Sequence, residues 1–265
     1  MAAHISRERW LTRRETLVLL LGATGSTLAA CTIGPGPTPP AGVDAHPPPD
    51  TAPPTSTPPT TTPPTPGGVL TRVPQLRPHA HNTSVALTFD DGPDPHTTPQ
   101  VLDLLAALGA HASFCVIGSQ VTGHETLVRR IAAEGHTIVN HTHRHPLRVA
   151  RLTSTQLDDE IRRPQAVLGD LLGSAPTLFR CPGGEWSPTV LSAVSYAGLR
   201  PLGWSVDSRD WTRPGTATIT SRLLLAAAGD IMLSHDGGGD RSQTITALRE
   251  VIPTLTGRGL TFIPL

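Results

Sequence analysis

The stretch Thr88-Phe89-Asp90-Asp91-Gly92-Pro93 closes an apolar, strand-like run that begins at Val85. A second strand-like run, residues 137–139, leads directly into Asn140-His141-Thr142-His143-Arg144-His145. The first segment supplies two adjacent carboxylates, and the second supplies imidazoles with i, i+4 spacing. One carboxylate and two imidazoles can hold a catalytic zinc and leave a coordination position open for water. The remaining carboxylate is then free to accept a proton from that water, so we expect one metal site built from both segments.

Strand-like and helix-like segments alternate from residue 79 to the C-terminus, which predicts a parallel sheet. Seven strand-like runs are expected, at residues 85–89, 113–117, 137–139, 177–179, 202–206, 231–233 and 260–263. Helices are expected over 98–108 and 125–133, and over 153–172 with a kink or interruption at Pro164. The segment of about 185 residues is short for an eight-unit barrel of about 250. We therefore predict an incomplete or distorted (β/α) barrel, with a doubly wound open sheet as the alternative.

In either architecture, catalytic and binding residues lie at the C-terminal ends of the strands. The polar residues that follow predicted strands are Asp90, Asp91, His141, His145, Arg180, Asp207, Asp210 and His235. Their shared placement supports a single site at that edge of the sheet.

Residues 1–30 resemble an export signal. The apolar run 17–21 is too short to span a bilayer, and Arg13-Arg14 precedes it, as in twin-arginine signals. Leu28-Ala29-Ala30-Cys31 resembles a bacterial lipobox, which implies cleavage before Cys31 and attachment of a lipid to its sulfur. We expect a lipoprotein on the outer face of the cytoplasmic membrane. An ordinary secretory signal is the alternative, and the choice between the twin-arginine and general secretory routes stays open.

Residues 31–78 are rich in Pro and Thr, and half of the 28 prolines fall between Pro35 and Pro66. Such a composition cannot bury apolar surface and favours extended conformations, so we expect a disordered linker that reaches into the cell wall. Residues 79–265 are the expected catalytic domain. The formal net charge is +0, and no basic stripe with interleaved aromatics occurs. Nucleic acid is therefore not an expected partner.

The motifs resemble those of the polysaccharide deacetylase family, also called carbohydrate esterase family 4 or the NodB-homology domain. Residues 88–93 match the first motif of that family and residues 140–146 match the second. Asp207-Ser208-Arg209-Asp210-Trp211 resembles the fourth motif, and Leu233-Ser234-His235 the fifth. The resemblance covers about residues 84–265.

The resemblance implies a role for each residue. Asp91, His141 and His145 would bind a divalent metal, most commonly zinc, with cobalt or another ion possible. Asp90 would be the general base, and Arg180 would hold it in place. His235 would be the general acid, supported by Asp210.

The third motif, Phe179-Arg180-Cys181-Pro182-Gly183-Gly184, departs from the family, because Gly183 stands where an aromatic residue is usual. A glycine can still offer its backbone N–H to an oxyanion, but it offers no side chain to the sugar. Pro182, Gly183 and Trp211 are the expected substrate contacts.

Several other residues have simpler expected roles. His143 is expected to point away from the metal, and Asp207 to brace its own loop. Trp186 and Trp204 are expected to contribute to packing. Cys115 and Cys181 are expected to stay unpaired.

The expected activity is metal-dependent hydrolysis of N-acetyl groups on an amino-sugar polymer, which releases acetate and breaks a non-peptide amide bond. Peptidoglycan, at N-acetylglucosamine or N-acetylmuramic acid, is the expected substrate of a protein at that location. An O-acetyl esterase acting on xylan and a chitin-oligosaccharide deacetylase are alternatives that use the same site. An alternative of another class is a non-catalytic lipoprotein that binds the cell wall.

Overall fold

Strand β1 (Ser84–Gly92) lies at the centre of one curved sheet, and eight of its nine residues are buried. The computed structural model describes Gly36 and residues 67–265. The remaining strands are β2 (Ala112–Val116), β3 (Thr137–Asn140), β4 (Leu178–Phe179), β5 (Arg200–Pro201), β6 (Val206–Asp207), β7 (Ile231–His235) and β8 (Thr261–Phe262). Their order is β5-β4-β3-β2-β1-β7-β6, and β8 pairs with the start of β1. Every pairing is parallel, and the strand order follows a ring that is open between β5 and β6, which confirms the incomplete (β/α) barrel.

One predicted strand is replaced by two short strands, one before it and one at its end. The run 202–206 was expected to be continuous, but β5 ends before it and β6 begins at its last residue. Gly203, between them, lies against the chain near Val69, where a Cβ would come within 2.8 Å of the Val69 Cγ1 atom. The carbonyl of Gly203 also accepts a hydrogen bond from Arg180. Residues 202–205 lie outside the strands of the sheet, and the described residues form eight strands, close to the predicted number of about seven.

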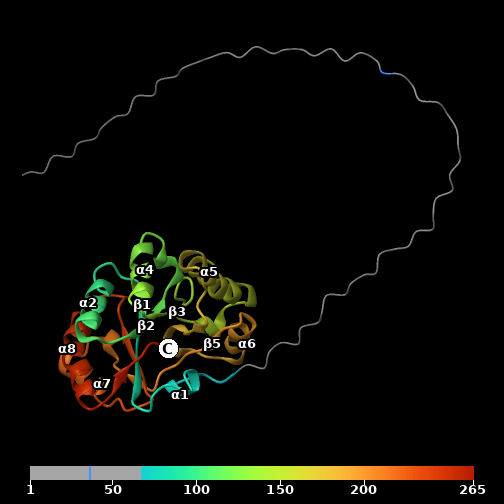
Figure 1. Ribbon diagram of the computed structural model, residues 1–265. Coiled ribbons are helices and arrows are strands. Elements are labelled where there is room, and N and C mark those ends of the chain that lie inside the picture. Colours follow the sequence, from blue (N-terminus) through green and yellow to red (C-terminus); the bar gives the residue numbers. More distant parts are fainter. Residues whose placement is uncertain (1–35, 37–66) are drawn as a thin grey trace, which may run out of the picture. The chain divides into compact units, whose positions relative to one another are not determined.

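The helices surround the outside of the sheet (Figure 1). They are α1 (Val73–Leu76), α2 (Thr98–Leu108), α3 (Gly118–Val121), α4 (Glu125–Ala133), α5 (Ser154–Leu172), α6 (Pro188–Tyr196), α7 (Thr216–Leu223) and α8 (Ser242–Gly257). Short 3-10 turns occur at η1 (Val149–Arg151), η2 (Pro182–Gly184) and η3 (Asp210–Thr212). The bounds predicted for α2 and α4 are confirmed. No helix among the described residues is both long enough and apolar enough to cross a membrane.

Helix α5 continues through Pro164, so the predicted helix is not interrupted there. Thr153 and Gln156 form a capping box at its start. A proline in a helix removes one backbone N–H and crowds the preceding turn. Here Asn140 donates its side-chain amide to the Ile161 carbonyl at 2.8 Å, and Pro164 itself is buried. Tertiary contacts therefore hold the helix where its local sequence would weaken it.

Successive side chains of β1 point alternately into two separate hydrophobic core clusters. Leu87 and Phe89 belong to the main cluster, together with residues of α2, α4 and α8. Ala86 belongs to a second cluster with residues of β2, β3, β4 and β7. Side chains two apart on a strand share a face, so Thr88 and Asp90 follow Ala86 toward the inside of the half-barrel.

The last residues of the predicted linker are part of the folded domain. Leu70 forms a bridge with Leu202, and Arg72 forms an antiparallel bridge and an ion pair with Asp230. Val73 and Leu76 are buried in the second core cluster. The folded part of the chain therefore begins before residue 79, because these apolar side chains pack against inward-facing residues of the central strands. The rest of the predicted linker and the signal segment with Cys31 lie outside the described residues, apart from the isolated Gly36.

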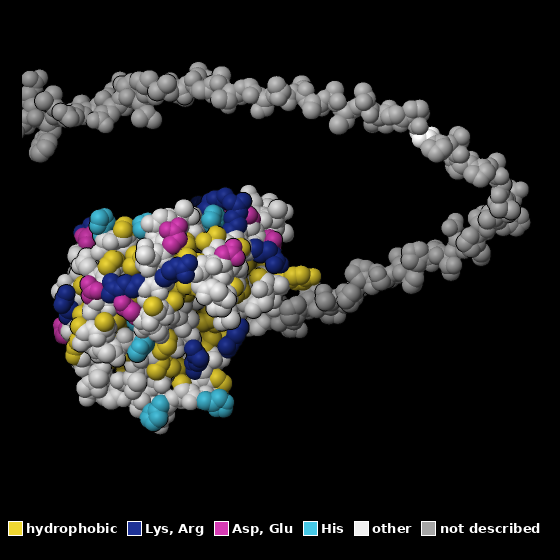
Figure 2. All heavy atoms as spheres, turned by 45° about the horizontal axis from the view of Figure 1, so that its top comes forward, with side chains coloured by type: hydrophobic (Ala, Val, Ile, Leu, Met, Phe, Trp, Pro, Cys, Tyr) yellow, Lys and Arg dark blue, Asp and Glu magenta, His cyan; other side chains and the backbone are white. Residues whose placement is uncertain are grey.

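Charges of both signs mix on the face drawn in Figure 2, where arginines lie among acidic side chains.

Candidate active site

A bulge at the end of β1 brings two neighbouring carboxylates to the same site. The pairing of β1 with β2 shifts register between Asp90 and Gly92, and Asp91 has φ 76°. In a regular strand, adjacent side chains point to opposite faces. The left-handed residue breaks this alternation, which is costly for a non-glycine and is typical of functional sites. Both Asp90 and Asp91 therefore line one cavity.

The histidine motif is a tight turn after β3, held from several sides. Thr142 and His145 have φ values of 65° and 56°. The His145 N–H donates to Thr142 Oγ1 at 3.1 Å. Glu160, a buried acid on α5, accepts from the backbone N–H groups of His143 and Arg144 at 2.9 and 2.7 Å. These bonds fix the orientation of the turn and thus of its two imidazoles.

His141 is oriented by the end of β4. Its Nδ1 lies 2.9 Å from the backbone oxygen of Arg180. A carbonyl can only accept, so Nδ1 carries a proton, and Nε2 is the nitrogen that faces the cavity.

The three predicted ligands converge. Asp91, His141 and His145 each offer one ligand atom, and these atoms all lie within 4.8 Å of one another. Asp91 Oδ1 is 3.5 Å from His141 Nε2 and 3.1 Å from His145 Nε2. This oxygen is buried and has no hydrogen-bond partner among the described residues.

The donor set fits a divalent cation. Burial opposes ionisation of Asp91, but the two imidazoles outweigh it and hold its pKa well below the usual range. An ionised carboxylate with two imidazoles is a set that suits zinc and related ions, and a buried oxygen without a partner is suited to a metal.

Asp90 is held by Arg180. Arg180 is completely buried, and its Nη1 donates to Asp90 Oδ1 at 2.8 Å and to Thr88 Oγ1 at 2.7 Å. Its Nη2 donates to the Gly203 carbonyl at 2.9 Å. Burial would raise the pKa of Asp90, but Arg180, His141 and His235 together hold it below the usual value. Asp90 is therefore ionised, and Arg180 fixes its direction.

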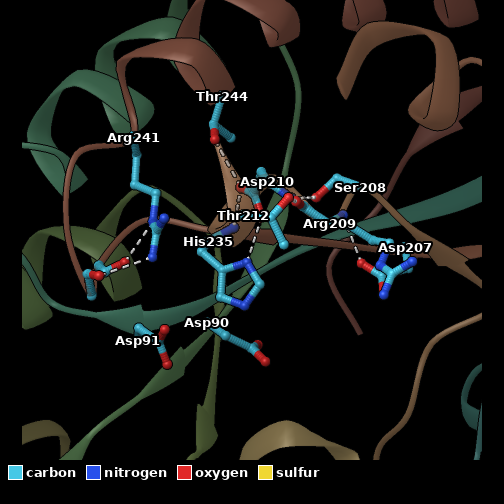
Figure 3. Close-up of polar contacts among 12 residues, drawn as sticks. Asp90, Asp91, Asp207, Ser208, Arg209, Asp210, Thr212, His235, Arg241 and Thr244 are labelled. Carbon is cyan, nitrogen blue, oxygen red and sulfur yellow. Dashed lines mark hydrogen bonds and ion pairs between the residues drawn. The ribbon is translucent and has the colours of Figure 1, made fainter. Parts of the chain in front are cut away.

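His235 and Asp210 form a second ionisable pair opposite Asp90 and Asp91 (Figure 3). His235 Nδ1 lies 2.6 Å from Asp210 Oδ1, and the His235 backbone N–H donates to Asp210 Oδ2 at 2.9 Å. Thr244, in the first turn of α8, also donates to Asp210 Oδ2, at 2.8 Å. Burial would lower the pKa of His235, but Asp210 outweighs burial and raises it. The imidazolium form is therefore favoured near neutrality.

These groups share one cavity of about 330 Å³. Its lining consists of Asp90, Asp91, His141, His145, Leu147, Gly183, Trp211, His235, Gly238 and Arg241. Trp211 is exposed at the rim, and Gly183 has open space where a side chain would stand. Pro182, also expected to contact substrate, is buried and lies outside this lining.

Other predicted placements are confirmed. His143 lies outside the ligand cluster, with its Nδ1 beside Gly118. Asp207 accepts from the Arg209 backbone N–H at 2.8 Å and so braces its own loop. Trp186 stacks edge-on against Phe179, and Trp204 lies 5.7 Å from the Arg180 guanidinium carbon.

Cys115 and Cys181 are free and buried. Burial raises the pKa of both thiols, that of Cys181 to about 12.

Several supporting residues were not identified from the sequence. Glu160, Thr244 and Arg241 are ordinary helix or loop residues until the fold brings them to the site. Asp236 is a similar case: its side chain is buried, and Thr98 Oγ1 donates to it at 2.5 Å. Burial raises the pKa of Asp236 to about 7. The only available signal was an acid directly after His235, which is too common a pattern to predict burial.

Known proteins resemble this chain in sequence and in fold. A family model described as polysaccharide deacetylase matches residues 78–202. A chitooligosaccharide deacetylase from Rhizobium leguminosarum bv. trifolii is 40% identical over 202 residues, which cover 72% of this chain and 94% of the relative. A peptidoglycan-N-acetylglucosamine deacetylase from Bacillus cereus is 41% identical over 182 residues, 68% of this chain and 84% of the relative.

A solved structure agrees with the sequence relatives. The crystal structure of a peptidoglycan N-acetylglucosamine deacetylase bound to a benzamide derivative superposes with a TM-score of 0.67 at 35% identity. The match covers 69% of this chain and 86% of that structure. The two sequence relatives match over 94% and 84% of their own length, and the chain therefore belongs to the polysaccharide deacetylase family.

Proposed function

We propose that this protein is a metal-dependent N-deacetylase of peptidoglycan, acting on N-acetylglucosamine or N-acetylmuramic acid residues. The observation that carries the proposal is the joint placement of three units in one cavity. These are the ligand triad, the carboxylate of Asp90 on Arg180, and the His235–Asp210 pair. A proton acceptor and a proton donor on either side of a metal site are what amide hydrolysis requires.

Asp91, His141 and His145 would hold the metal, and we propose zinc from the donor set. When bound, such a metal polarises a carbonyl and lowers the pKa of water toward about 7. Asp90 takes the proton from the attacking water. A carboxylate held ionised by Arg180 is a weak base, so it would suit a water whose pKa is lowered at the metal site. His235, kept protonated by Asp210, then gives its proton to the leaving nitrogen.

The choice of polymer rests on where we propose the protein acts. The two relatives above are equally similar, and their names point to chitin oligosaccharides in one case and to peptidoglycan in the other. We propose export and lipidation at Cys31, which would place the domain beside peptidoglycan. Open space at Gly183 leaves room in the cavity for a substituted sugar.

Acetate release tests the activity. The purified protein would be given peptidoglycan, chitin oligosaccharides and acetylated xylan, with and without a chelator. We expect release from peptidoglycan that a chelator abolishes and that zinc or cobalt restores. Release from xylan alone would favour the esterase, and no release from any polymer would favour a binding lipoprotein.

Membrane fractionation tests the location. The Cys31→Ser variant should move to the soluble or unprocessed fraction, because its sulfur can no longer carry a lipid. A variant still processed at the same bond and retained in the membrane would exclude lipidation at Cys31.

A further inference from the structure

The glycine run after β7 lies directly against the proposed ligand Asp91. A Cβ on Gly237 would lie 2.0 Å from the Asp91 carbonyl oxygen and 2.4 Å from its carbonyl carbon. A Cβ on Gly238 would lie 2.8 Å from Asp91 Oδ2. Only a chain without side chains can approach so closely, so this loop touches both the backbone and the carboxylate of Asp91.

Arg241 holds that loop in place. It is 4% exposed, its Nε donates to the Gly237 carbonyl at 2.7 Å, and its Nη2 donates to the Gly238 carbonyl at 3.1 Å (Figure 3). The backbone of Arg241 accepts from Ile245 at the start of α8, a helix whose apolar face is buried in the core. The guanidinium therefore links a rigid helix to the loop that contacts Asp91.

Asp91 needs such support. It stands in a left-handed conformation at a bulge, and its Oδ1 has no hydrogen-bond partner among the described residues. None of the ion pairs found in residues 67–265 joins Arg241 to Asp91, so Arg241 acts through the loop.

We propose that Gly237, Gly238 and Arg241 form a brace that positions the Asp91 carboxylate for metal binding. They are positioning residues and act on the reaction only through Asp91. This inference rests on the proposed metal site. Groups that orient metal ligands typically change metal affinity by about 10- to 100-fold when removed.

Zinc affinity, measured by competition with a chromophoric chelator, tests the brace separately from activity. Arg241→Met keeps most of the side-chain length and removes both donors, and we expect about 10- to 100-fold weaker zinc binding. Gly238→Ala should weaken zinc binding in the same range, and Arg241→Lys should recover part of the affinity lost in Arg241→Met.

Two controls match these variants. Gly239→Ala lies in the same loop with φ 132°, but nothing stands within 4 Å of its Cβ. Arg213→Met removes an exposed guanidinium that pairs with Asp240. Both should bind zinc within about twofold of the wild type.

The outcomes separate three cases. Wild-type protein that binds no zinc would overturn the proposed metal site. Folded Arg241→Met and Gly238→Ala that bind zinc like the wild type would overturn the brace alone. A lower thermal midpoint of the metal-free variants with unchanged zinc affinity would reduce the loop to a purely structural role. If Arg241→Met does not fold, the comparison of Gly238→Ala with Gly239→Ala decides.

Discussion

Asp90→Asn separates proton transfer from metal binding. The amide has nearly the same shape as the carboxylate but cannot accept a proton from water. General bases contribute typically about 10²- to 10⁴-fold to rate, so kcat should fall by that factor. At about 1.36 kcal/mol for each tenfold, the loss corresponds to about 3–5 kcal/mol in the barrier. Zinc should remain bound, because Asp90 Oδ2 lies 3.7 Å from His141 Nε2 and is not one of the three proposed ligands.

The same change also affects folding. Arg180 is completely buried and would lose its counter-ion, although Thr88 Oγ1 and the Gly203 carbonyl would still accept its hydrogen bonds. Breaking a buried ion pair by removing one partner costs about 3–5 kcal/mol, and an amide oxygen that still accepts from Arg180 places the expected loss near the lower end.

Activity must therefore be expressed per folded, zinc-loaded molecule. Urea unfolding gives the free energy of unfolding, metal analysis gives the zinc content, and acetate release gives kcat. Asp103→Asn is a matched control, since Asp103 is exposed and pairs with Arg130 on the surface. It should change stability by no more than about 1 kcal/mol and leave kcat unchanged. A folded, zinc-loaded Asp90→Asn with kcat within tenfold of the wild type would refute the general-base role, and loss of zinc would make Asp90 a ligand.

Three further variants test other parts of the site. His235→Ala should keep its zinc and slow amide cleavage more than cleavage of 4-nitrophenyl acetate, because a phenolate leaves without a proton; equal losses on both substrates would contradict the general-acid role. Thr244→Val should lower kcat about 10- to 100-fold at unchanged KM, since a hydrogen bond to a charged group contributes about 1.5–3 kcal/mol, whereas Thr244→Ser should stay near the wild type. Asp236 has a folded pKa of about 7, above its usual range, so in metal-free protein its stabilising contribution is complete below about pH 4 and is lost as pH rises through about 7. Asp236→Asn should remove this fall in the free energy of unfolding between pH 5 and pH 8, and an unchanged fall would assign the pH dependence to another group.

Strand ends and ligand spacing were predictable from the sequence because each depends on local pattern. The strand that ends in Asp90-Asp91 and the strand that leads into His141 through His145 place these residues at the same edge of a parallel sheet. This placement does not depend on the conformation of the loops. Helix α2 was predicted over its full extent because a proline stands in its first turn and Gly109 follows its last residue.

Features that depend on distant contacts were not predictable. Helix α5 is not interrupted at Pro164, and Asn140, twenty-four residues earlier in the sequence, donates to the Ile161 carbonyl in the same stretch of helix. The start of the domain was placed too late because Val73 and Leu76 follow a proline-rich run and become core residues only against the sheet. Arg241 and Thr244 were not identified because their role depends on where α8 begins relative to β1 and η3.

Alkylation of the two buried thiols can be used to measure unfolding of this domain. Cys115 lies beside Asp90 in the sheet, and both cysteines have 0% exposure with raised pKa values. Alkylating reagents attack the thiolate, which burial suppresses in both residues. Each added alkyl group, counted by mass spectrometry, therefore records an opening of the core, and the labelling rate of each cysteine measures how often its side of the half-barrel opens.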